Sequence, residues 1–311
     1  MPPPRGALPA SPKSVIIRKL CGLSSYRFAR SEKEMFMKNR LWETNFWEAE
    51  LSNAMLQGAE LGGADLLKAD LRNAVLWKAN LRGADLWRAN LENAVLMQVN
   101  FKDADLRNTN LRHANLREAN LQNANLQNAN LMKADLQGAN LQGAMLQNAC
   151  LWGANLRNAD LTGANLQQTE LTGANLQNAV IRQADLWRSN FMNTDLHEAD
   201  LHGADLTGAN LQNALLWKAN LRDADLWRAD LRNALLYEAD LSGAVLIATN
   251  FIGVKFQKAK GVTVRQLSEV RTLYNCDFDM KLKARIKSIC PHLLERPAVF
   301  SVTYPLSSAV M

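Results

Sequence analysis

Residues 64–83 read ADLLKADLRNAVLWKANLRG, and this five-residue pattern determines the fold of most of the chain. From Phe46 to Phe256 every fifth residue is Leu, Phe or Ile, at 43 consecutive positions without a gap. The residue two positions earlier is Ala in 35 of these repeats and a small or β-branched residue in the others. The backbone must therefore bring two side chains back to the same apolar environment once every five residues.

Ordinary secondary structure does not satisfy this period. In an α-helix, five residues advance the apolar position by about 140°, so the Leu series would visit every side of the helix. In a flat strand, an odd period would alternate the Leu between the two faces. A chain that bends by a fixed angle every five residues directs each Leu, and the small residue two before it, into one interior. The period thus predicts an all-β solenoid.

The second position after each Leu indicates the number of sides. Gly or Asn, which tolerate the left-handed backbone of a tight turn, occupy it in 16 of 21 alternate repeats and in 8 of 22 interleaved repeats. This alternation requires an even number of sides, and two sides would leave no room for paired Leu side chains and a turn. We therefore expect four sides and 20 residues per coil.

The A(D/N)LXX pattern resembles the pentapeptide-repeat family over about two thirds of the chain. The resemblance implies a right-handed quadrilateral β-helix, here of about eleven coils with short α-helical caps. At a strand spacing of about 4.8 Å the rod would be about 50 Å long. Some members of this family resemble double-stranded DNA and bind DNA gyrase, which confers quinolone tolerance, so gyrase is one partner that the resemblance implies.

Charge and proline divide the chain into segments. The repeats carry a small negative net charge, both ends are basic, and all eight prolines lie outside the repeats. Capping boxes at Ser31–Glu34 and Thr263–Gln266, with an N-cap at Asp279, predict helices. The helix that starts after Thr263 should carry Leu267, Val270, Leu273 and Tyr274 on one side. The expected organisation is a flexible basic arm (1–30), a capping helix (31–45), the β-helix (46–256), a helical cap (257–296) and a flexible tail (297–311).

Large apolar side chains occupy outward positions near both ends of the rod. Steps of 20 residues place two groups on one face and further tryptophans on the opposite face. The predicted interaction surface consists of Trp77, Met97, Trp217, Tyr237, Leu215, Leu235, Trp47, Trp87, Trp187 and Trp227. Exposed patches of this kind mark contact surfaces. Either the terminal segments cover them, or the protein self-associates as a homodimer or binds another protein through them.

The charge pattern bears on the remaining partners. A DNA mimic needs dense, unbalanced negative charge, whereas residues 41–256 carry 24 acidic and 18 basic residues. This argues against gyrase as the target. The basic ends leave open binding to nucleic acid or to a membrane surface, although no recognised nucleic-acid motif is present.

Catalytic motifs are not evident in the sequence. His197 and His202 lie five residues apart and should therefore point from adjacent faces, which disfavours a shared metal ion. Cys150 occupies an outward position and has no nearby His to act as a base. We expect no enzyme activity, catalytic residue, cofactor or metal. Few cysteines, no signal peptide and no long apolar run favour a cytoplasmic, non-catalytic protein-interaction or scaffold rod.

Overall fold

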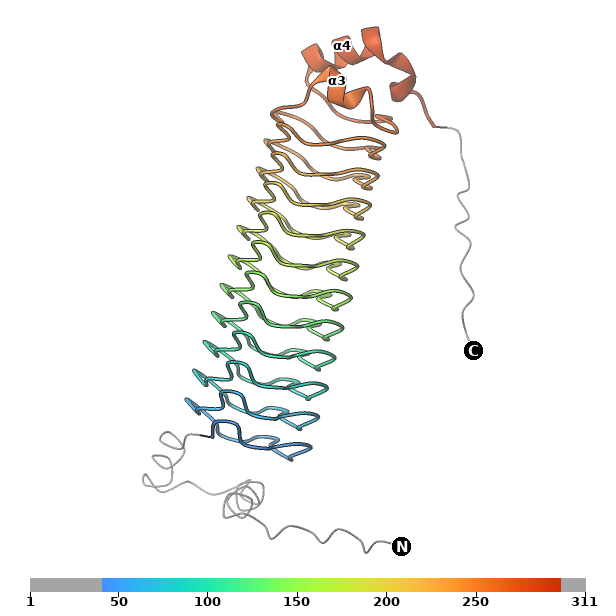
Figure 1. Cartoon of the computed structure of the whole chain (residues 1–311). Helices are drawn as coiled ribbons and strands as arrows, with labels where there is room; N and C mark the ends of the chain where they lie inside the picture. Colours follow the sequence, from blue (N-terminus) through green and yellow to red (C-terminus); the bar gives the residue numbers. More distant parts are fainter. Residues whose placement is uncertain (1–40, 298–311) are drawn as a thin grey trace, which may run out of the picture.

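The computed structural model describes residues 41–297, which form a long solenoid with a small helical cap at its C-terminal end (Figure 1). The repeats run continuously to residue 260, and three short helices follow: α3 (Val264–Leu267), α4 (Met280–Ile289) and the 3₁₀-helix η1 (Pro291–Leu294). The expected arm (1–30), most of the expected capping helix (31–40) and the tail from residue 298 lie outside the described residues.

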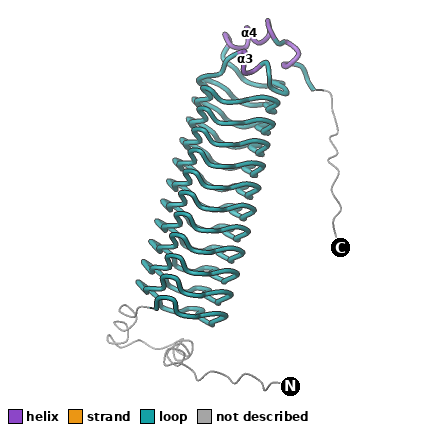
Figure 2. Tube along the Cα trace, viewed as in Figure 1, coloured by secondary structure: helices purple, strands orange, loops and turns teal. Residues whose placement is uncertain are grey.

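Parallel bridges between successive coils set the register of the solenoid. Each bridge joins residues 20 positions apart, as in Asp70–Asn90, and a bridge occurs at every fifth residue. Four bridges per turn give the four sides, and each rung is too short to count as a strand, so the coils appear as loops and turns in Figure 2. The prediction of a four-sided solenoid with about eleven coils is confirmed.

The backbone of one repeat shows why the period is five. The N–H of Leu71 donates to the carbonyl oxygen of Asn90 in the next coil at 2.7 Å. The N–H of Ala74 then donates to the carbonyl oxygen of Leu71 at 3.0 Å, which closes a tight turn. Asn73, within this turn, has a φ of 56°. The bend thus follows each Leu and precedes the next Ala.

The left-handed residue recurs in every turn, including turns without Gly or Asn. Lys68 and Arg88 both have a φ of 57°. Their N–H groups donate to carbonyl oxygens of the next coil at 2.8 and 3.0 Å, so the ladder holds this conformation in place. The alternation of Gly and Asn in the sequence therefore does not mark two different backbone conformations. It reflects which turns contain a residue that adopts φ > 0 at low energetic cost.

The residue before each Leu has a structural role when it is Asp or Asn. The Oδ1 of Asp70 accepts a hydrogen bond from the N–H of Arg72 at 3.1 Å, and equivalent bonds recur along the rod. This local bond satisfies a backbone donor that faces outward at the corner. It explains why Asp and Asn dominate the position before the Leu.

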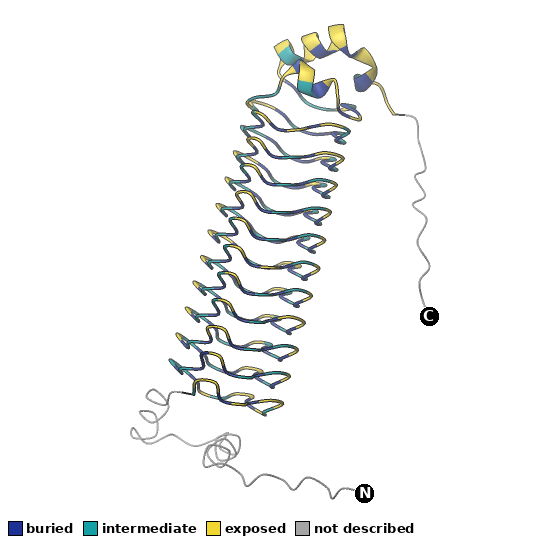
Figure 3. Ribbon diagram, in the orientation of Figure 1, coloured by how far each residue is buried: buried dark blue, intermediate teal, exposed yellow. Residues whose placement is uncertain are grey.

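The interior is a continuous apolar stack. The Leu and Ala positions of the repeats are almost completely inaccessible to solvent, as Figure 3 shows by the alternation of buried and exposed residues along each coil. Each buried Leu contributes about 1.5–3 kcal/mol before the loss of chain entropy is subtracted. Buried hydroxyls at Ala positions are satisfied locally, since Thr109 donates to the carbonyl oxygen of Leu106 at 2.7 Å. The stack is therefore the main stabilising contribution.

The solenoid starts five residues earlier than the sequence indicated. The N–H of Leu41 donates to the carbonyl oxygen of Glu60 at 2.8 Å, and Asn45 bridges Asp65. Residues 41–45 thus form a repeat and not the end of a capping helix. Leu41 stands five residues before Phe46, so the period itself extends to this repeat.

The first helix of the C-terminal cap is shorter than expected. The capping box at Thr263 is present, but α3 ends at Leu267, and Leu273 and Tyr274 lie beyond it. The chain then returns to the solenoid, where Thr272 bridges Asn250. The apolar spacing permits a helix, yet the open edge of the last coil offers unpaired backbone groups, and pairing with them is more favourable.

Helix α4 closes the end of the rod. Asp279 caps it by accepting a hydrogen bond from the N–H of Leu282 at 2.8 Å, and Ile286 faces the core. Phe278, directly before the N-cap residue, stacks on Phe256 of the last full coil with ring centroids 5.0 Å apart. The apolar stack of the solenoid thereby continues into the cap.

Candidate interaction surface

Two opposite faces of the rod carry the outward apolar side chains. The Trp217 face comprises the outward residues of the repeats centred on Leu56, Leu76 and every twentieth residue up to Phe256. The Trp227 face comprises those of the repeats centred on Phe46, Leu66 and every twentieth residue up to Leu246. The bridge register of 20 residues aligns each set as columns along the rod.

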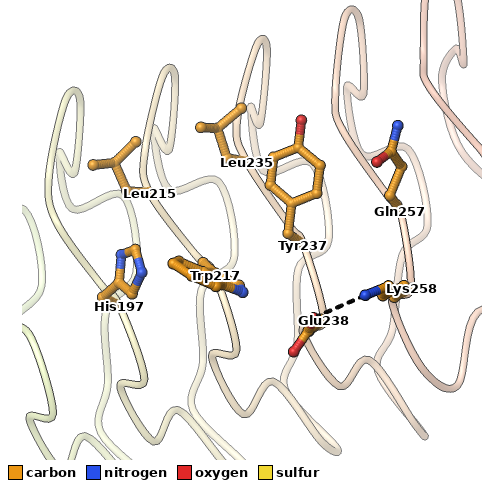
Figure 4. Close-up of a pocket in the computed structure, with 8 residues that line it drawn as sticks. All are labelled: His197, Leu215, Trp217, Leu235, Tyr237, Glu238, Gln257 and Lys258. Atoms are coloured by element: carbon orange, nitrogen blue, oxygen red, sulfur yellow. Dashed lines mark hydrogen bonds and ion pairs between the residues drawn. The ribbon is translucent and has the colours of Figure 1, made fainter.

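The C-terminal part of the Trp217 face forms a shallow apolar groove of about 450 Å³. In Figure 4, Leu215 and Leu235 lie in one row, and Trp217 and Tyr237 lie beside them on the same two coils. The rim residues are His197, Glu238, Gln257 and Lys258. The rings of His197 and Trp217 pack edge to face, with their centroids 4.6 Å apart. With 42% of its surface exposed, Trp217 is the most accessible apolar group of the groove.

The N-terminal part of the same face carries a second apolar patch. Val75 and Val95 bridge one another on adjacent coils, and Trp77 and Met97 follow them across the face. All four side chains are half-buried, and Met55 in the preceding coil is exposed. The structure therefore brings the predicted residues of this face together as two separate patches.

The apolar patches replace a local hydrogen bond. In the middle of the face, Asp195 accepts a bond from the N–H of His197 at 3.1 Å, and Asn175 accepts one from Gln177 at 3.0 Å. Leu215 and Leu235 have no side-chain acceptor, so the backbone N–H groups that follow them lack this bond. These apolar side chains stack on one another between adjacent coils and leave apolar surface facing solvent.

Tryptophans on these faces carry a cation over the ring. Lys218 lies 5.2 Å from the ring centroid of Trp217, and Lys78 lies 4.7 Å from that of Trp77. The left-handed turn residue directly follows the tryptophan and is thereby directed over its ring. Such pairs contribute about 0.5–1 kcal/mol at exposed sites and fix the ring orientation.

On the Trp227 face the predicted residues are spread out. Trp47 and Trp227 are exposed, whereas Trp87 and Trp187 are half-buried beneath Arg88 and Arg188. These tryptophans do not join the two patches of the opposite face. That any of these residues forms an interaction surface stays a prediction.

The structure also exposes apolar side chains that the sequence-based prediction omitted. Trp42 and Trp152 are exposed, and Val245 and Ile247 are exposed beside Trp227. All four occupy outward positions of the repeat, either before or directly after the central Leu. Their outward position in the repeat is a signal that the sequence does contain. Trp42, Trp152 and Val245, however, lie in columns that hold few other large apolar residues.

Several charges on the rod are paired with opposite charges in the same or the neighbouring coil. Lys68 lies 3.0 Å from Glu48 in the neighbouring coil, and Arg72 bonds Asp70 two residues earlier. The hydrogen bond from the Arg72 guanidinium lowers the pKa of Asp70 below its ordinary value. Acidic rows are thus interleaved with basic rows along the described solenoid, unlike the unbalanced phosphate charge of DNA.

The described residues offer little that resembles a reactive centre. Residues 41–297 contain no group of three or more His, Cys, Asp or Glu side chains arranged to hold a metal ion. Burial raises the pKa of the Cys276 thiol to about 12, and this thiol donates to the carbonyl oxygen of Phe251. His197 packs on Trp217, while the Nδ1 of His202 lies 3.0 Å from the carbonyl oxygen of Arg222. Among the helices of this range, none has the length and apolar character needed to cross a bilayer.

Several solved structures of other proteins are similar to this chain. HetL, a pentapeptide repeat protein involved in heterocyst differentiation regulation from the cyanobacterium Nostoc sp. strain PCC 7120, is 32% identical, with 76% of this chain and 95% of HetL covered and a TM-score of 0.44. A second pentapeptide repeat protein from Nostoc PCC 7120 is 30% identical, with 47% and 84% covered and a TM-score of 0.21. QnrB1, a plasmid-mediated fluoroquinolone resistance protein, is 15% identical, with 64% and 93% covered and a TM-score of 0.45.

Comparison with curated proteins gives no significant match. The family model for pentapeptide repeats matches eight times, in segments that together cover residues 40–73 and 76–260. These segments coincide with the solenoid described above. The chain therefore belongs to the pentapeptide-repeat family, and its solenoid is the right-handed quadrilateral β-helix of that family.

Proposed function

We propose that this protein is a non-catalytic interaction rod that binds protein partners through the apolar patches of its outer faces. The observation that carries this proposal is the groove formed by Leu215, Trp217, Leu235 and Tyr237. A rigid ladder holds these side chains, so binding costs little conformational entropy. Exposed Trp and Tyr are also the residue types that dominate binding energy at protein interfaces.

A gyrase-directed DNA mimic is the alternative that the family relationship raises. The pairing of Lys68 with Glu48, and of Lys218 with Glu198, argues against it because such pairs neutralise the field of the acidic rows. We expect no inhibition of DNA supercoiling by the purified protein at micromolar concentration. Inhibition at that level would favour the mimic over the interaction rod.

The basic C-terminal cap supports a different alternative. Lys281, Lys283, Arg285 and Lys287 on α4 are all exposed. If they bound nucleic acid or an anionic membrane, the binding would weaken steeply with added salt. Binding through the apolar groove should instead persist at 0.5 M salt, so the salt dependence of any partner distinguishes the two.

The direct test is affinity capture from cell extract with the full chain and two variants. The double variant Trp217→Ser/Tyr237→Ser removes the anchors of the groove, and the matched control Trp152→Ser removes an exposed tryptophan from another face. We expect partners to be retained by the wild type and the control but lost with the double variant. An identical set of captured proteins for all three chains would contradict the proposal.

A further inference from the structure

The Trp217 face has nearly the same side-chain order in both directions along the rod. The column directly after each central residue reads Gln57, Trp77, Met97, Arg117, Gln137, Arg157, Gln177, His197, Trp217, Tyr237 and Gln257. Residues at equal distances on the two sides of Arg157 are of similar kind. From the centre outward the pairs are Gln with Gln, Arg with His, Met with Trp, Trp with Tyr, and Gln with Gln. The register of 20 residues makes this a spatial symmetry as well as a sequence pattern.

The neighbouring column follows the same symmetry about the same coil. Directly before each central residue stand Met55, Val75, Val95, Asn115, Asp135, Asn155, Asn175, Asp195, Leu215, Leu235 and Lys255. About Asn155, valines match leucines, and Asn and Asp match one another. Only the outermost pair, Met55 and Lys255, breaks the order.

A palindromic face is complementary to a second copy of itself. A two-fold axis that lies in the interface at the level of Leu156, parallel to the face and perpendicular to the rod, makes two rods antiparallel. Each column then lies against the same column of the other copy, read in reverse. Apolar residues thereby meet apolar residues at both ends, and the polar middles meet each other.

We propose that the Trp217 face binds a second copy of this chain in an antiparallel, side-by-side homodimer. This rests on the proposed function and names the partner of one of its faces. In this arrangement Trp77 lies opposite Tyr237, and Met97 lies opposite Trp217, a sulfur–aromatic contact. Val75 and Val95 enter the groove lined by Leu215 and Leu235.

Symmetry makes the contact large enough to be specific. The two patches are seven coils apart, or about 34 Å at the coil spacing of a parallel sheet. A single patch is much smaller than the roughly 800 Å² per partner of a stable interface. In the antiparallel dimer both patches of both copies are buried together, so that four patches form two equivalent contacts.

The Trp227 face does not support the same pairing. Reversed about its own midpoint, it would place Asp65 opposite Asp225, Asp85 opposite Asp205 and Asp105 opposite Asp185. Like charges facing each other across a desolvated contact are strongly unfavourable. The self-complementarity is therefore a property of the Trp217 face and not of every face of a repetitive rod.

The two-fold arrangement also brings some like charges together, which weakens the dimer. Arg157 lies opposite its own symmetry copy, and Glu118 lies opposite Glu198. These repulsions are partly offset because Lys78 meets Glu238, and because Arg117, which lies opposite His197, is level with Asp195 in the neighbouring column. Screening of the axial repulsion should make the dimer tolerant of salt, and Arg157→Gln should lower the dissociation constant several-fold.

The arrangement can be tested by charge complementation in sedimentation velocity experiments with the full chain. Met97→Glu and Trp217→Arg alter exposed or half-exposed side chains, so both variants should fold. We expect each alone to raise the dimer dissociation constant at least tenfold. An equimolar mixture of the two should recover dimers, because the carboxylate introduced at position 97 of one chain meets the guanidinium introduced at position 217 of the other. The second contact of that mixed dimer keeps its native pair.

Each outcome is decisive. A parallel dimer would oppose identical positions, so the mixture would show no recovery, and the proposal would be wrong. A wild-type chain that stays monomeric at 200 µM also overturns it, and dimer formation only after removal of residues 298–311 would identify that segment as the occupant of the groove. The control Trp152→Arg should leave dimerisation unchanged. A monomeric wild type whose partner capture still depends on Trp217 would remove the dimer but keep the proposed function.

Discussion

Thr272 forms a parallel bridge with Asn250, 22 positions earlier, whereas the bridges of the solenoid proper join residues 20 positions apart. The two extra residues accommodate α3, and the ladder resumes beyond it. Asp277 bridges Lys255 with the same offset. The cap therefore extends the ladder beyond a single interruption at α3. Residues at this interruption should be sensitive to substitution.

Gly261 lies at that interruption and should not tolerate a side chain. It has a φ of 69°, and a Cβ there would lie 2.3 Å from the backbone nitrogen of Ser242. Gly83 has a φ of 66°, but a Cβ there would meet nothing within 4 Å. We expect Gly83→Ala to cost about 1 kcal/mol and Gly261→Ala about 2–4 kcal/mol. Equal shifts of the denaturation midpoint would contradict the contact at Gly261.

Leu126 should be essential in the middle of the stack. Its side chain has no solvent exposure, and its N–H donates to the carbonyl oxygen of Met145 at 2.7 Å. Leu126→Ala should cost about 2–5 kcal/mol, and Leu126→Asp should split the rod because a carboxylate cannot be buried there. The matched control Gln127→Asp changes the adjacent outward position. Hydrogen exchange measured along the chain should show lost protection around residues 106–146 only in the Leu126 variants.

The thiols of the described residues should differ in reactivity. With a pKa of about 12, Cys276 is a thiolate to only about one part in ten thousand at pH 8. Cys290 is buried, whereas Cys150 is half-exposed on an outward position. We expect iodoacetamide to modify Cys150 well before Cys276, as measured by peptide mass spectrometry. Modification of Cys276 at the same rate as Cys150 would mean that the final partial coil opens readily.

Acid should destabilise the solenoid by protonating the Asp side chains that precede the central Leu residues. The hydrogen bond from Arg72 lowers the pKa of Asp70, and the Ser242 hydroxyl lowers that of Asp240. Because the folded pKa lies below the unfolded pKa of about 3.8, the stabilisation is complete above that pH and is lost as the pH falls through the folded value. The melting temperature should therefore fall below about pH 4. In Asp70→Asn/Asp240→Asn, which keeps the Oδ1 acceptors, that fall should be smaller; an unchanged profile would contradict this assignment.

The repeat pattern was enough to predict the solenoid, because Leu126 and its counterparts recur with a period that only a regularly bending chain can bury. It also placed the outward tryptophans, since a fixed register converts a residue number directly into a face. The ends could not be predicted in the same way. Residues 272–278 join the ladder because the open edge of the neighbouring coil supplies backbone partners, which no local pattern reveals. At the other end the expected helix boundary at 45 was wrong, although Leu41 continues the five-residue period.

Which outward residues act together depends on the stacked coils. Trp77 and Trp217 share a face without touching, whereas Leu215 and Tyr237 lie two positions off a 20-residue step and line one groove. The left-handed conformation of Lys68 was likewise hidden, because a long basic side chain gives no local signal for φ > 0. The interstrand hydrogen bonds impose it, and they exist only once the coils have stacked. Local preference sets the period, and the ladder formed by distant residues sets the conformation and the surface.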